Sequence, residues 1–205
     1  MAAVAFAQRP PVLENEFVRV LKVTSEPHQK GRMHDHKVNR VMIYLTPGTQ
    51  RLEYQGGKPV ELKWKASQAL WSPASGMHTS EITSDKAVTI VEIELKKPGN
   101  GAKIATKLDP VKVDPKHYKV EMENDHVRVI RFQNEPHGRI PLHEHTLDRV
   151  QVFLTPIANR ATTADGKSTE LRKEAGEVGW GTPVTHHEEN LADAPIELLV
   201  VELKK

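Results

Sequence analysis

The sequence contains no cysteine among its 205 residues. This absence excludes a disulfide framework, a cysteine-ligated zinc or iron–sulfur site and a thiol nucleophile. No apolar run approaches the roughly 18 residues that a membrane helix needs, so we expect no membrane association. Aromatic residues make up only 5% of the chain, and 29 Lys and Arg are balanced by 27 Asp and Glu. Because the basic residues are interspersed and form no stripe, we expect no nucleic-acid partner.

The composition is otherwise that of a globular protein, with 38% hydrophobic and 27% charged residues. A chain of this length suffices for one large or two compact domains. The residue type that stands out is histidine, with 11 copies that are clustered along the chain.

The first residues allow two interpretations. Ala5-Phe6-Ala7 followed by Gln8 matches the small-x-small pattern that a signal peptidase prefers. However, a charged segment before it is missing and the apolar stretch is short. A remnant of an export signal predicts a periplasmic or secreted protein, whereas a plain alanine-rich leader predicts a cytoplasmic one.

The rest of the chain is a tandem duplication. The segment Val12–Val20 reappears as Glu121–Val129, 109 positions later. The same offset relates His34-Asp35-His36 to His143-Glu144-His145, Arg40 to Arg149, Leu45-Thr46-Pro47 to Leu154-Thr155-Pro156, and Trp71 and His78 to Trp180 and His187. We therefore predict a leader at 1–11, a first domain at 12–97, a linker at 98–116 and a second domain at 117–205. The linker is rich in Pro, Gly and Lys, and its residues 104–113 could add an edge strand.

Each copy shows the pattern of β-strands rather than helices. Runs of β-branched and aromatic residues, such as Phe17–Val23 and Val41–Leu45, are punctuated by turn signals at Gln55–Lys58 and Asp165–Lys167. Many short strands at regular spacing indicate an antiparallel barrel or double-sheet roll in each copy.

The histidines have the spacing of metal ligands. Side chains at positions i and i+2 of a strand share a face and lie roughly 6.5–7 Å apart at the backbone. Three imidazoles suit an iron, manganese, nickel, zinc or copper ion with open coordination positions. The candidate metal ligands are His34, His36 and His78 in the first copy and His143, His145 and His187 in the second. His186 faces away from its neighbour His187, and the repeat offset selects His187.

These motifs resemble the cupin superfamily, and specifically a bicupin, with two tandem barrels. His34-Asp35-His36 followed by Gly48 resembles the first cupin motif, and Ala175–Val178 followed by Trp180, Pro183 and His187 resembles the second. The resemblance covers nearly the whole chain from about Val12. It implies an all-β fold of two double-stranded β-helix (jelly-roll) barrels, each with a histidine-ligated metal inside its mouth. It also implies a small-molecule ligand and allows a homodimer, because cupins often pair through their barrel faces.

The glutamate ligand of the first cupin motif is missing in both copies. Arg40 and Arg149 stand at its shorter spacing, whereas valines stand at its longer one. Alternation of Val150 and Val152 with Gln151 predicts that Val150 faces inward, which turns the arginines outward or to the rim. Arginines inside the barrels would instead oppose a dication and bind a carboxylate or phosphate, with Gln151 as a further donor.

Three classes of function remain open. The first is a metal-dependent enzyme with dioxygenase-, isomerase- or lyase-type chemistry on a small molecule, with Glu81, Glu188, Glu189 and Asn190 as candidate bases or supporting groups. The second is a non-catalytic cupin that binds a metal or a small anion, and the third is a degenerate structural barrel pair. The histidine triplets favour the first two classes, whereas the missing glutamate favours the last two. We expect a metal-binding bicupin that acts on a small molecule.

Overall fold

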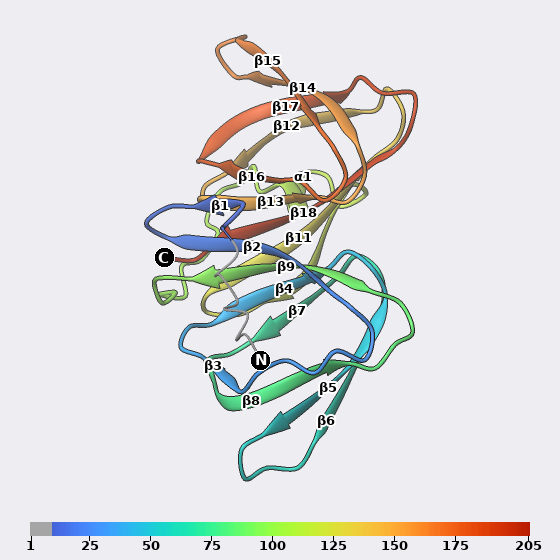
Figure 1. The fold of residues 1–205 in the computed structure, drawn as a ribbon. Helices are drawn as coiled ribbons and strands as arrows, with labels where there is room; N and C mark the ends of the chain where they lie inside the picture. The colour runs from blue at the N-terminus through green and yellow to red at the C-terminus, as the bar shows by residue number, and fades with distance from the viewer. Residues whose placement is uncertain (1–9) are drawn as a thin grey trace. The chain divides into compact units, whose positions relative to one another are not determined.

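The computed structural model describes residues 10–205 (Figure 1). The Ala5-Phe6-Ala7 motif of the expected leader lies outside the described residues. The chain divides after Lys97 into two compact units, here called unit 1 and unit 2. Strands make up 56% of the structure and helix only 2%. Within residues 10–205, no helix has the length and apolarity needed to cross a bilayer.

The described part of unit 1, from residue 10 onward, forms nine strands in two antiparallel sheets. The strands are Leu13–Glu14 (β1), Val18–Ser25 (β2), His34–His36 (β3), Arg40–Tyr44 (β4), Gly48–Tyr54 (β5), Val60–Trp64 (β6), Gln68–Ser72 (β7), Ser75–Ile82 (β8) and Val88–Leu95 (β9). The strand order is β1-β2-β9-β4-β7 in one sheet and β3-β8-β5-β6 in the other. Figure 1 shows these sheets as the two layers of a roll.

Unit 2 repeats this topology. Its elements are Pro110–Val113 (α1), Tyr118–Glu123 (β10), Val127–Asn134 (β11), Arg139–His145 (β12), Arg149–Phe153 (β13), Ile157–Thr163 (β14), Ser168–Lys173 (β15), Val178–Gly181 (β16), Val184–Asn190 (β17) and Ile196–Leu203 (β18). The sheets run β10-β11-β18-β13-β16 and β12-β17-β14-β15, so each strand has the place of its counterpart in unit 1. The duplication seen in the sequence is therefore a duplication of the fold.

The predicted turns form hairpins at corresponding places. Gly56 joins β5 to β6 and Gly166 joins β14 to β15, with φ values of +73° and +85°. Only glycine adopts such angles without strain, because it lacks a Cβ. These turns set the register of the outer hairpin in each unit.

The whole predicted linker, residues 98–116, lies within unit 2, which begins at Pro98. The carboxylate of Asp109 accepts two hydrogen bonds from the guanidinium of Arg128, at 3.0 and 2.9 Å, and both side chains are buried. The backbone amide of Glu144 in β12 donates to the carbonyl of Leu108 at 2.8 Å. The edge strand expected at 104–113 is wrong: α1 forms there, because Pro110 has the φ angle of a first helical position and lacks the N–H that a strand ladder needs.

The inward face of β4 and β13 also differs from the prediction. Arg149, Gln151 and Phe153 line the interior of unit 2, whereas Val150 lies on the other face of its sheet. Arg40 lies inside unit 1 in the same way. Val150 and Val152 are fully buried although they lie outside the barrel interior. Because both faces of this sheet are buried, apolar alternation cannot distinguish the inward face from the outward one.

Candidate metal sites

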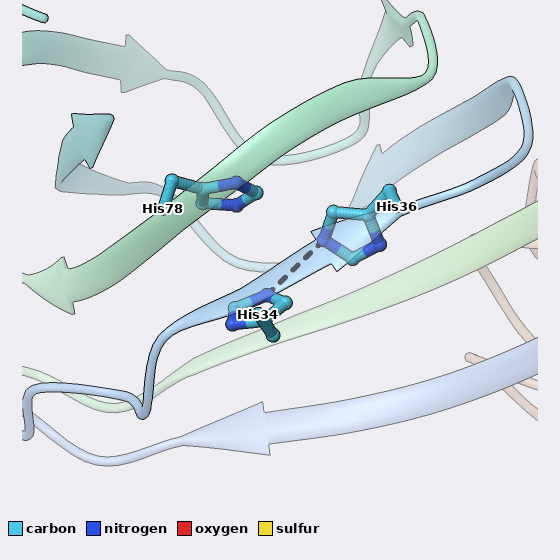
Figure 2. A group of neighbouring side chains, drawn as sticks. All are labelled: His34, His36 and His78. Carbon is cyan, nitrogen blue, oxygen red and sulfur yellow. Dashed lines mark hydrogen bonds between the residues drawn. The ribbon is translucent and has the colours of Figure 1, made fainter. Parts of the chain in front are cut away.

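Three histidines from two strands meet in unit 1. His34 and His36 lie at successive same-face positions of β3, and His78 of β8 pairs directly with His34. Figure 2 shows the three rings directed toward one another. Their centroids are 4.9 Å (His34–His36), 4.6 Å (His34–His78) and 5.3 Å (His36–His78) apart. One ligand nitrogen from each ring lies within 4.8 Å of the other two, close enough for one ion.

Unit 2 holds a matching cluster in which His186 takes the place expected for His187. The rings of His143, His145 and His186 are 4.5–5.8 Å apart, and their ligand nitrogens also lie within 4.8 Å of one another. His187 is exposed on the opposite face of β17. We correct the expected third member of this cluster from His187 to His186.

A β-bulge explains the one-residue difference. In unit 1, a two-residue step on β3, from His34 to His36, pairs with a three-residue step on β8, from His78 to Ser75. In unit 2, the two-residue step from His143 to His145 pairs with a step of equal length on β17, from His186 to Val184. The extra residue in β8 changes the repeat offset from 109 to 108 before the third histidine. Because side chains alternate between faces, a one-residue shift selects the wrong neighbour.

Backbone carbonyls fix which ring nitrogen faces the centre of each cluster. Nδ1 of His34 lies 2.8 Å from the carbonyl of Arg32, Nδ1 of His78 lies 2.9 Å from that of Gly76, and Nδ1 of His143 lies 2.9 Å from that of Pro141. A carbonyl oxygen only accepts, so Nδ1 carries the proton in these rings. In the neutral ring, Nε2 then presents a lone pair, as a metal ligand requires.

The surroundings favour the neutral form of several rings. Burial, followed by the charge of Arg40, lowers the pKa of His36 to about 3. Burial also lowers the pKa of His186 to about 4, and it lowers the pKa of His145. Neutral imidazoles are the form that binds first-row transition metals.

Two buried ring nitrogens in unit 2 receive no hydrogen bond. Nε2 of His186 has no partner. Nε2 of His143 is 3.2 Å from the hydroxyl of Tyr118, but this hydroxyl donates its proton to Oε2 of Glu188 at 2.9 Å. An unsatisfied buried polar atom is costly, and an ion bound at the cluster by both nitrogens would satisfy them. The donor set of unit 2 therefore fits a metal ion.

Unit 1 differs because an arginine contacts its cluster. Nη1 of Arg40 lies 2.8 Å from Nε2 of His36 and 2.6 Å from Oε1 of Glu92, while Nη2 donates to the hydroxyl of Ser72 at 2.8 Å. Nε2 of His34 is 3.2 Å from Nε2 of His36. Two nitrogens bound to one ion at about 2.1 Å lie roughly 3.0–3.4 Å apart, so this spacing fits two ligands of a single ion.

The corresponding arginine of unit 2 hydrogen-bonds to the backbone and not to a histidine of its cluster. Nη1 of Arg149 donates to the carbonyl of Thr182 at 2.6 Å, and its buried Nε has no partner. A Cβ at Gly181 would lie 2.8 Å from this guanidinium, so the glycine makes room for the arginine. Burial lowers the pKa of Arg149.

The cavities beside the two clusters differ in size. The cavity in unit 1 has a volume of about 220 Å³, and its lining includes all three histidines and Arg40. The cavity beside His145, Arg149 and His186 in unit 2 has a volume of about 30 Å³. That is room for roughly two water molecules.

Comparison with known proteins identifies the fold. No family model and no curated protein sequence matches the chain. The structure of AerE from Microcystis aeruginosa superimposes with a TM-score of 0.67 at 13% identity, over 92% of this chain and 88% of that one. A variant of the bicupin oxalate decarboxylase from Bacillus subtilis gives a TM-score of 0.64 at 13% identity, over 91% and 69%. The chain has a bicupin fold.

This confirms the predicted pair of jelly-roll barrels and places the clusters within the bicupin. At 13% identity, the likeness establishes the fold alone. Each barrel has three histidines that could bind a metal ion. Glu92 and Glu94 form a further group with His36, in which Arg40 already pairs with Glu92.

Other residues considered in the sequence have different places in the bicupin. Glu188 lies inside unit 2, where the amide of Asn159 donates to its Oε1 at 2.8 Å. Glu189 faces outward and pairs with Arg139 and Arg160. The side-chain amide of Asn190 donates to backbone carbonyls and so holds a turn. Glu81 pairs with Arg51 on the strand ladder and does not line the cavity.

Tyr118 and Glu202 also support the cluster of unit 2, although the sequence motifs did not indicate them as members of the site. Tyr118 begins β10 and is buried against His143. Glu202 lies in β18, and its Oε1 accepts from Nδ1 of His145 at 2.9 Å. Glu202 could have been found from the sequence, because the repeat pairs it with Glu94. Tyr118 has no described counterpart in unit 1.

Proposed function

We propose that this bicupin binds a divalent first-row transition metal ion at its histidine clusters and acts on a small polar molecule in the cavity of unit 1. The observation that carries this proposal is the convergence of three imidazole nitrogens, in a metal-binding geometry, on a cavity of about 220 Å³. A metal bound by three histidines keeps open positions and polarises a substrate oxygen as a Lewis acid.

Iron, manganese, nickel, zinc and copper all suit a three-histidine donor set. Mn(II) centres are described for oxalate decarboxylase from Bacillus subtilis, and Mn(II) is therefore the first ion to test. Dioxygenase-, isomerase- and lyase-type reactions are each compatible with such a site.

The cavity wall supplies groups that would orient a substrate. Ser72 and Glu92 hold the guanidinium of Arg40 in place, so that it forms a fixed charge pair on the wall. The ring of Tyr54 lies 5.1 Å from that of His78 and covers one side of the cluster. A ligand with both polar and apolar groups would match this mixed lining.

One observation favours a non-catalytic role for unit 1. The nitrogen of His36 that a metal would bind already lies 2.8 Å from Nη1 of Arg40. An ion must displace this contact and also tolerate a buried positive charge nearby. If it cannot, unit 1 would bind a small molecule through Arg40 and the histidines without a metal.

Metal content distinguishes these functions. Protein produced without an affinity tag and dialysed against each of the five ions would be analysed for bound metal. We expect His186→Ala to lose the ion of unit 2 and His34→Ala to lose that of unit 1. His187→Ala is the matched control, because it removes an exposed imidazole from the same strand, and it should retain both ions. Full occupancy in His186→Ala and His34→Ala, or no metal in the unaltered protein, would overturn the proposal.

A further inference from the structure

We propose that the cluster of unit 2 is a closed, structural metal site, and that only the cluster of unit 1 is accessible to an external ligand. This inference rests on the proposed function, because it requires an ion at both clusters. Structural metal sites are closed around the ion, whereas catalytic sites keep a position open for water or substrate.

The cluster of unit 2 is more buried than that of unit 1, as a closed site and an open site require. His143, His145 and His186 are 0%, 4% and 6% exposed. In unit 1 only His78 is buried, and His34 and His36 are partly exposed. Together with cavities of about 30 and 220 Å³, this leaves space for an organic molecule beside the cluster of unit 1 alone.

Substitutions between the two copies account for the closure. Phe132 fills the interior of unit 2 at the position of Val23 in unit 1. Glu188 stands at the position of Ser80, since each lies two residues beyond the third histidine of its cluster. Tyr118 packs against the rings of both Phe132 and His143, at 4.7 and 5.2 Å, and completes the cover.

The covering groups also suit an ion chemically. Oε2 of Glu188 lies 3.8 Å from Nε2 of His143, so a carboxylate faces the cluster. Hydrogen bonds from Tyr118 and Asn159 hold this carboxylate in position. In unit 1 the carboxylate of Glu92 lies at the same distance, 3.8 Å from Nδ1 of His36, but the guanidinium of Arg40 also contacts Nε2 of that ring at 2.8 Å. The corresponding Arg149 of unit 2 hydrogen-bonds to a backbone carbonyl instead. A negative neighbour strengthens the binding of a dication and a positive one weakens it, so the closed site should also be the tighter one.

Cobalt(II) in single-site variants provides the test. His34→Ala leaves unit 2 as the loaded site, and His186→Ala leaves unit 1; His34→Gln and His186→Gln serve if either alanine variant fails to fold. Imidazole is the probe, because its coordination changes the visible spectrum of Co(II). We expect imidazole to shift the spectrum in His186→Ala and to leave that of His34→Ala unchanged. We also expect Co(II) to bind at least tenfold more tightly in His34→Ala.

Exchange of the covering residues gives the matched controls. Phe132→Val with Glu188→Ser, added to His34→Ala, should make unit 2 respond to imidazole. Val23→Phe with Ser80→Glu, added to His186→Ala, should abolish the response of unit 1.

An equal imidazole response in the two single-site variants would overturn the inference while leaving the proposed function intact. Cobalt in unit 1 alone would also overturn it. Absence of cobalt from both variants would overturn the proposed function, and this inference with it.

Discussion

Glu202 joins the cluster of unit 2 to a buried ion-pair network: one oxygen accepts from Nδ1 of His145 at 2.9 Å and the other from Nε of Arg128 at 2.7 Å. Burial alone raises the pKa of Glu202, but the hydrogen bonds from His145 and Arg128 outweigh it and lower the pKa, so the group is ionised. An ionised acceptor at Nδ1 orients the ring and makes Nε2 a stronger ligand.

Glu202→Gln should therefore weaken metal binding at unit 2. Loss of a carboxylate behind a ligating histidine typically costs about 10–100-fold in affinity. Titration with Mn(II) in the His34→Ala background measures this effect. Glu197→Gln is the control, because Glu197 lies in the same strand and pairs with Arg131 away from the interior. Equal affinities in the two variants would contradict the role of Glu202.

Arg40→Met should strengthen metal binding at unit 1. The substitution removes a buried positive charge from Nε2 of His36 and frees the carboxylate of Glu92 beside the cluster. At 4 Å, two unit charges interact by about 4 kcal/mol at an effective dielectric of 20, so a gain of at least about tenfold is expected. Calorimetry in the His186→Ala background measures it, with Arg19→Met as a control for the loss of an arginine that pairs with Glu94. Unchanged or weaker binding would show that Arg40 does not oppose the ion.

Asp109→Ala should destabilise unit 2 strongly. It removes the acceptor of both hydrogen bonds that Arg128 donates to the segment before α1, and it leaves a buried guanidinium partly unpaired. Breaking a buried ion pair on one side costs about 3–5 kcal/mol of unfolding free energy. Urea denaturation tests this, and Lys107→Ala, an exposed change in the same segment, should have little effect. A small loss in Asp109→Ala would mean that this segment is a dispensable linker.

The metal-free protein should lose stability as the pH falls below neutrality. The pKa of His36 is about 3 and that of His186 about 4, whereas an unfolded histidine titrates near 6.5. Between these values the unfolded chain binds protons that the folded chain does not, so acid favours unfolding. Urea midpoints measured with a chelator should fall from about pH 6.5 toward about pH 4, and less steeply in His186→Gln. His187→Gln controls for the substitution itself; a midpoint that stays level or rises on acidification would contradict the burial of neutral rings.

Much of the candidate site could be read from spacing along the chain. His34 and His36, like His143 and His145, share a face because side chains alternate along a strand. The third histidine could not be chosen in the same way, because the bulge in β8 is a feature of strand pairing. His186 and His187 are equivalent by sequence, and only their pairing with β12 shows which one faces inward.

The sequence by itself determined the duplication, the strand-rich fold of each copy and five of the six clustered histidines, since these follow from local periodicity and a constant offset. The tertiary structure decided that Arg40 and Arg149 lie inside, that His186 replaces His187 and that one cluster is open and the other closed. The physical reason is that these features depend on which faces of the sheets are covered. A sheet buried on both sides has no sequence pattern for its inward face, and a cavity depends on side chains from strands far apart in the chain.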